Sequence, residues 1–275
     1  MRKPILALAL LAAIAALGGC GGKATSFVSV DWPPSGSAAD FDTLVARSSA
    51  TGYVRPTNAI SNVSLLTTIE VAGIRSAFAL FEDGLHALDA GTVTVRAHAP
   101  VGAASVFKTL DRLQLSVSGT IEYLYTSLVS NPLGLNLTFD GVEHHVFTAS
   151  GSTSVPAFTD SVRSVATLFV GNPVGGSTHA RSSDLEITWV NGSADTTVYV
   201  VAAVVSQVDS SKVAMADMVR DGGEYTTVPA SRLALLPAGA ARVSVARWRV
   251  VYHSEGARLV GLASESLVLR NITLN

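Results

Sequence analysis

The sequence predicts an all-β protein in which two domains fold as antiparallel β-sandwiches. Three observations lead to this fold class. Several segments alternate apolar with polar residues at a period of two, most clearly residues 112–125. Gly, Asn, Asp and Pro residues separate these segments, and very few segments have the 3.6-residue period of a helix. Many short strands separated by turns are typical of β-sandwiches.

The first residues form an element of a different kind. Arg2 and Lys3 precede an apolar run at 5–17, and the small residues Gly18 and Gly19 follow it. This order is the layout of a secretory signal. The run is shorter than the about 20 residues that a membrane-spanning helix needs. We therefore expect residues 1–19 to be a helical signal peptide that is cleaved.

The end of this segment, Leu17-Gly18-Gly19-Cys20, resembles the lipobox of bacterial lipoproteins. The resemblance implies cleavage between Gly19 and Cys20, a diacylglycerol on the Cys20 thiol, and an N-linked acyl chain such as palmitate. Gly21 stands where lipoproteins retained in the inner membrane carry Asp, so the resemblance favours the outer membrane and leaves the leaflet open. An ordinary secretory signal with an incidental cysteine is the alternative.

Composition narrows the possible partners. The chain carries 19 basic and 21 acidic side chains, and loss of Arg2 and Lys3 leaves 17 basic against 21 acidic, a net charge of −4. This balance argues against a nucleic-acid partner, which requires a basic surface. It also provides no polybasic patch for anionic lipids. The expected membrane contact is therefore the lipid on Cys20, which is the only cysteine and leaves none for a disulfide.

Behind the anchor we expect a lipidated tether at 20–26 and an N-terminal β-sandwich-like domain at 27–171. The six residues 21–26 extend over about 20 Å at most, which would keep the domain close to the membrane. The domain's expected strands lie at 63–71, 93–97 and 112–125, the last with a bend at Gly119. Asp140-Gly141 separates two further alternating segments, 135–139 and 142–147, and predicts a two-residue hairpin between them.

A loop-like segment at 172–184 leads into the expected C-terminal domain, 172–275. Its predicted elements are strands at 185–189, 198–205, 213–219, 242–253 and 258–274, with turns at Asn191-Gly192 and 221–223 and a helical turn at 229–236. The length and strand count are those of one immunoglobulin-like sandwich. Residues 184–189 and 221–230 are similar to C-terminal β-domains of uncharacterised bacterial lipoproteins. That resemblance implies a fold but indicates no activity. The paired cysteines of true immunoglobulin domains are missing.

Possible metal ligands are few. His144 and His145 are adjacent on a predicted strand and therefore point to opposite faces, whereas Glu143 and His145 share one face. Two ligands fall short of the three or four that zinc requires, so we expect solvent-exposed hairpin histidines. Asp40 and Asp42 have no calcium-loop spacing and suit a solvated turn better. The sequence thus predicts no metal and no cofactor.

Catalytic motifs are equally scarce. No Gly-x-Ser-x-Gly elbow, phosphate-binding glycine loop or dinucleotide fingerprint occurs, although a Ser-His-Asp site could still assemble in space. The aromatic residues suit core packing better than a sugar-stacking platform, except Trp32, which we expect in a loop. The remaining histidines and the aromatic residues considered are His86, His98, His179 and His253, and Trp32, Trp189, Trp248, Tyr123 and Tyr125.

These observations favour a membrane-anchored protein of the bacterial cell envelope that is not an enzyme and acts in binding or envelope structure. Its expected partner is another envelope protein or a polysaccharide. The alternative is a carbohydrate-active or other hydrolytic enzyme with scattered carboxylates, for which the adjacent Glu82 and Asp83 give poor support. Two carboxylates about 5–10 Å apart in an aromatic cleft would favour the enzyme. An exposed apolar patch above about 600 Å² would favour a protein partner.

Overall fold

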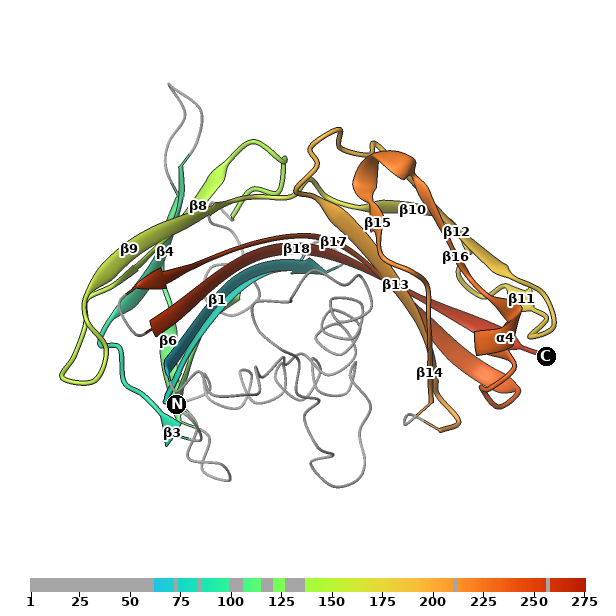
Figure 1. Cartoon of the computed structure of the whole chain (residues 1–275), viewed down its shortest axis with the longest axis horizontal. Helices are drawn as coiled ribbons and strands as arrows, with labels where there is room; N and C mark the ends of the chain where they lie inside the picture. Colours follow the sequence, from blue (N-terminus) through green and yellow to red (C-terminus); the bar gives the residue numbers. More distant parts are fainter. Residues whose placement is uncertain are drawn as a thin grey trace. The chain divides into compact units, whose positions relative to one another are not determined.

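A computed structural model describes residues 62–71, 74–83, 86–98, 106–114, 121–126, 137–209, 212–255 and 258–275 (Figure 1). Almost all of these residues lie in strands and connecting loops. Among the described strand pairs whose register is defined, β11 pairs with β18 in parallel and the others are antiparallel. The predicted all-β, antiparallel fold class is confirmed. The signal segment, Cys20 and the tether lie outside the described residues.

The chain forms two compact units. The N-terminal unit comprises Ala59–Thr167 with Trp248–Ser266, and the described part of the C-terminal unit comprises Leu168–Arg247 with Leu267–Asn275. The last two strands, β17 (Gly239–Glu255) and β18 (Arg258–Leu274), contribute residues to both units. The domain boundary at 171 and 172 stays a prediction.

Two sheets build the C-terminal unit. One is β10-β12-β16, and the other has the order β14-β13-β17-β18. Consecutive strands such as β12 and β13 lie in different sheets, as in the Greek-key connections of immunoglobulin-like sandwiches. Their bounds are β10 (Phe169–Asn172), β12 (Leu185–Val190), β13 (Tyr199–Ser206), β14 (Val213–Met215) and β16 (Tyr225–Val228).

The core of this unit lies between the two sheets. Strand β12 alternates, with Leu185, Ile187 and Trp189 buried, whereas β13 is buried on both faces apart from the half-buried Tyr199 and Val205. One buried cluster joins these residues to side chains of β17 and β18, including Val243, Val245, Ile272 and Leu274. A sheet pair with this shared apolar interior is a sandwich, so the predicted immunoglobulin-like architecture holds for the C-terminal unit.

Small elements complete the unit. The predicted strand at 213–219 is two short strands, β14 and β15 (Val219–Arg220), both paired with β13. The predicted helical turn is α4 (Ala230–Leu233), which begins after Pro229 and buries Leu233. Strand β11 (Thr178–His179) pairs in parallel with the end of β18, and η1 (Asp221–Gly223) is a turn of 3-10 helix.

The N-terminal unit also contains two sheets. One continues from β18 in the order β1-β2-β7-β6, and the other is β5-β4-β8-β9. The faces meet where Thr68 on β1 hydrogen-bonds His145 on β8 and where the Phe81 ring packs edge-on against Phe158. The bounds are β1 (Asn62–Val71), β2 (Ile74–Asp83), β3 (His86–Ala87), β4 (Val93–His98), β5 (Val106–Thr109), β6 (Asp111–Gln114), β7 (Ile121–Thr126), β8 (His144–Ala149) and β9 (Phe158–Arg163).

Two predicted elements of this unit differ from the structure. The run at 112–125 was expected to be one strand, but it folds back as β6 and β7, which pair with Gln114 opposite Ile121. The hairpin predicted at Asp140-Gly141 is wrong because β8 pairs with β4 and β9 instead of with 137–139. Asp140 still makes a turn, since its carboxylate accepts hydrogen bonds from the backbone N–H groups of Val142 and Glu143.

No helix among the described residues combines the length and the apolar character needed to cross a bilayer.

Candidate interaction surface

The predicted anchor and several predicted site residues fall outside the described residues: Gly19, Cys20, Trp32, Asp40 and Asp42. Glu82 and Asp83 are consecutive on β2, and the predicted single histidines lie on four different strands, β3, β4, β11 and β17. Within the described part of the chain, no group of three or more His, Cys, Asp or Glu residues is arranged to hold a metal ion.

His144 and His145 point to opposite sides of β8, as the strand period predicts, but they are not both exposed. His144 is exposed, whereas His145 is fully buried. The His145 Nε2–H donates to the Thr138 carbonyl at 2.9 Å, so Nδ1 accepts from the Thr68 hydroxyl at 2.7 Å. The expectation of exposed histidines is therefore wrong for His145, because this residue alternates in phase with the buried Phe147.

The environment of His145 favours the neutral ring. Burial lowers the pKa of His145 to about 4, although the Thr138 carbonyl and the Asp140 carboxylate act in the opposite direction. Burial alone would raise the pKa of Asp140, but the hydrogen bonds from Glu143 and Val142 outweigh it and lower that pKa. Burial raises the pKa of Glu143. His145 joins the two sheets as a neutral, fully hydrogen-bonded residue, which is a structural role.

A second buried polar group lies in the C-terminal unit. The Arg247 Nε donates to the Asp221 Oδ1 at 2.9 Å, and both side chains are almost completely buried. Asp221 also accepts from the Ser193 backbone N–H and, through its carbonyl, from the Trp189 indole N–H. Arg247 donates to the Asn191 carbonyl. The group ties β17 and the η1 turn to the loop after β12.

The aromatic residues behave as core residues where their side chains are described. Trp189 and Trp248 are buried, which confirms core packing for them. Tyr123 and Tyr125 lie on β7. Neither Trp189 nor Trp248 can therefore contribute to a sugar-stacking platform on the surface.

Two aromatic residues and a valine are exposed on the outward side of the β10-β12-β16 sheet. Phe169, Val190 and Tyr225 keep 56%, 52% and 61% of their accessible surface. Phe169 lies opposite Val190, and Tyr225 lies opposite Thr188, two residues earlier on the same strand. Since Leu185, Ile187 and Trp189 take the inward positions of β12, the residues between them must point outward.

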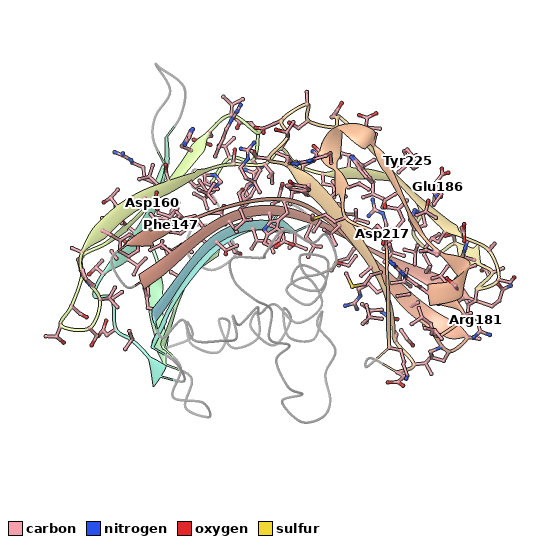
Figure 2. The ribbon with its side chains drawn as sticks, in the orientation of Figure 1. Phe147, Asp160, Arg181, Glu186, Asp217 and Tyr225 are labelled. Carbon is pink, nitrogen blue, oxygen red and sulfur yellow. The ribbon has the colours of Figure 1, made fainter. Side chains whose placement is uncertain are left out.

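We call this side of the sheet the outer face. Figure 2 labels two of its side chains, Glu186 on β12 and Tyr225 on β16. Its outward positions, taken from the strand alternation and the register, which shifts by one residue at Gly171 so that Asn172 lies opposite Thr188, are Phe169, Gly171, Asn172, Glu186, Thr188, Val190, Tyr225 and Thr227.

The outer face is a candidate interaction surface because its aromatic residues do not serve the core. A sandwich needs apolar residues on its inner faces only, so the exposed rings on an outer face are available for contact with another molecule. Of the outward residues, Glu186 carries a charge and none is a cation. The sequence contained one signal for this surface, namely that Val190 is apolar in the polar phase of its strand.

Comparison with known proteins adds little to this picture. No family model and no curated protein matches the chain. Among solved structures, the FN1–FN3 domains of chicken CNTN1 match with a TM-score of 0.26 and 11% identity over 81% of this chain and 70% of that one. The Clostridium thermocellum CbhA fibronectin(III)-like modules match at 0.24 and 11%, over 77% and 90%. The teleost fish polymeric Ig receptor ectodomain matches at 0.23 and 11%, over 76% and 98%. Because these scores are low, the fold assignment rests on the strand order.

Proposed function

We propose that the protein is a lipid-anchored binding or structural protein of the bacterial cell envelope that is not an enzyme. The observation that carries the binding role is the outer face, where Phe169, Val190 and Tyr225 are exposed together on one sheet. Rigid sheets that present exposed side chains outside the core are suited to recognition.

The anchor is the second part of the proposal. The lipobox-like residues Leu17 to Cys20 support a lipid on Cys20, and Gly21 supports the outer membrane over the inner membrane. Attached acyl chains contribute about 0.8 kcal/mol per buried CH₂ group, so two or more of them hold a protein stably at a membrane. In this proposal residues 20–26 are the tether, and two β-domains, 27–171 and 172–275, follow it.

The anchor is tested by expressing the full chain and a Cys20→Ala variant in a double-membrane bacterium. We expect the unaltered chain in the detergent phase of a phase separation and in the outer-membrane fraction, because its acyl chains partition into lipid. The variant should be found in the aqueous phase. Mass spectrometry of the mature N-terminal peptide provides an independent measurement, in which Cys20 should carry acyl chains. An unmodified Cys20 with equal partitioning of both chains would reject the anchor.

The binding role is tested by proximity labelling from the same two chains. If the proposal is correct, defined envelope components are enriched with the anchored chain and not with Cys20→Ala. Equal labelling in both cases would contradict a role at the membrane.

A further inference from the structure

We propose that the outer face binds a neutral polysaccharide chain. This inference rests on the proposed binding function and assigns it a ligand class. It is carried by the spacing of the two exposed rings, the charge of the face and the size of the face.

The rings are placed to contact separate sugar units of one chain. Phe169 and Tyr225 lie on the two outer strands of the sheet, β10 and β16, and the register offsets them by two residues. Two strand spacings and two residues along a strand separate their backbones by roughly 12 Å. Aromatic faces pack well against the apolar faces of pyranose rings, because both are flat and carry C–H or π surfaces.

The space between the rings is low and polar. Gly171 has no side chain, and a Cβ at that position would lie 3.3 Å from the Thr188 hydroxyl oxygen. Thr188 and Thr227 offer hydroxyl groups on the same face, and Glu186 offers a carboxylate. Asn172 lies opposite Thr188, and its side-chain amide donates to the Glu186 carbonyl. Such groups exchange hydrogen bonds with sugar hydroxyls, while the rings supply contact area.

The charge of the outer face favours neutral ligands over anionic ones. Among the outward residues, Glu186 is the charged side chain, and no arginine or lysine is present to pair with an anion. A sulfated or uronate-rich polysaccharide, or the phosphates of a lipid headgroup, would therefore meet a weakly negative surface. A neutral chain meets no such repulsion.

Size argues against a protein partner. Three short strands give a flat area of roughly 10 Å by 13 Å between strand axes, far below the about 800 Å² per partner that a stable protein interface buries. The face is large enough for a few sugar rings. A polysaccharide compensates for a small contact area by presenting many repeats to many anchored copies.

Affinity electrophoresis of the purified full chain in detergent tests the proposal. The gels contain hydroxyethylcellulose, galactomannan or β-1,3-glucan as neutral probes and alginate as an anionic probe, and a neutral-glycan array widens the search. We expect retardation by at least one neutral probe and none by alginate. Phe169→Ala and Tyr225→Ala should each weaken the binding about tenfold, because each removes one stacking ring.

Leu235→Ala is the matched control. Leu235 is 74% exposed in the same unit but lies outside the outer face, so its loss should leave retardation unchanged. Circular dichroism checks that all variants fold. Absence of binding to every neutral probe, retardation by alginate alone, or equal binding by the ring variants would overturn the proposal. So would self-association in sedimentation that the ring variants abolish, since this would identify the outer face as a protein interface. These outcomes do not depend on the partitioning of Cys20→Ala, so failure of the ligand assignment is distinguishable from failure of the anchor.

Discussion

Replacing Arg247 with methionine should destabilise the protein by about 3–5 kcal/mol, because the change leaves the carboxylate of Asp221 buried without its cation. Both side chains are almost fully excluded from solvent, and Asp221 Oδ1 lies 2.9 Å from Arg247 Nε. Methionine fills a similar volume, so the loss reports the unpaired charge rather than a cavity. Denaturant unfolding followed by far-UV circular dichroism gives the free energy of unfolding.

The loss should be concentrated in the C-terminal unit. Asp221 accepts from the Ser193 N–H and the Trp189 indole, and Arg247 donates to the Asn191 carbonyl. Breaking the pair therefore releases the loop between β12 and β13. Hydrogen exchange should become faster in β12 and β13, while the β8 amides of the N-terminal unit serve as the internal reference.

An exposed ion pair in the same unit provides the control. Arg232 lies 2.9 Å from Asp217, but both side chains are largely in contact with solvent. Arg232→Met should cost about 1 kcal/mol or less, because water screens such pairs. In a second control, the double variant Arg247→Met/Asp221→Asn should recover part of the lost stability, since no charge then remains unpaired. An Arg247→Met variant within 1 kcal/mol of the unaltered chain would show that the buried pair is not a major contributor.

The sequence predicted strands and their buried sides well where a strand packs directly against the core. The alternation of Leu185, Ile187 and Trp189 predicted β12 and its buried side, and the apolar run at 198–205 predicted the buried β13. Pro229 predicted the start of a helical turn, and α4 begins one residue later. These features depend on local periodicity and turn chemistry, which a single sequence contains.

Strand pairing was harder to predict from the sequence than the strands themselves. The Asp140-Gly141 turn forms, but a turn signal does not specify which strands pair, and β8 pairs with β4 and β9. Alternation at 112–125 likewise carried no sign of the reversal between β6 and β7. Pairing depends on burial across the whole unit, which local pattern does not encode.

The buried polar residues and the outer face were not predicted from the sequence for the same reason. Arg247 follows Val243 and Val245 in the apolar phase of β17, and His145 shares the phase of Phe147, so strict use of the period would have predicted burial for both. The outer face shows the converse, with Val190 in the polar phase. Phe169 could not have been assigned to the face because β10 was not predicted. Residues that break the pattern of their strand thus marked the polar core and the candidate surface.

Acidification should destabilise the N-terminal unit by about 3 kcal/mol through His145 alone as the pH falls from 6.5 to about 4. In the folded chain burial lowers the pKa of His145 to about 4, whereas the unfolded side chain titrates near 6.5. Between these values the unfolded state binds the extra proton. Stability from this residue is therefore fully present above pH 6.5, is lost as the pH falls, and does not change further below about 4.

The two hydrogen bonds of His145 explain why its ring resists protonation in the folded state. Nε2–H already donates to the Thr138 carbonyl, so an added proton must go to Nδ1, where the Thr68 hydroxyl donates. Protonation would reverse that hydrogen bond, so that the Thr68 hydroxyl accepts from Nδ1–H, and would leave a charge buried between the sheets. Burial raises the pKa of Glu143, so Glu143 acts in the opposite direction in the same pH range, and the effect of His145 must be isolated by substitution.

His145→Gln retains a donor for the Thr138 carbonyl and does not titrate. Denaturant unfolding at pH 7.5, 6, 5 and 4 should show a stability loss in the unaltered chain that exceeds the loss in His145→Gln by about 3 kcal/mol, whatever constant offset the substitution adds. His144→Gln is the matched control, since His144 is the exposed neighbour on the same strand. This variant should reproduce the pH profile of the unaltered chain. Parallel profiles for the unaltered chain and His145→Gln would mean that His145 is not the group that couples protonation to unfolding in this unit.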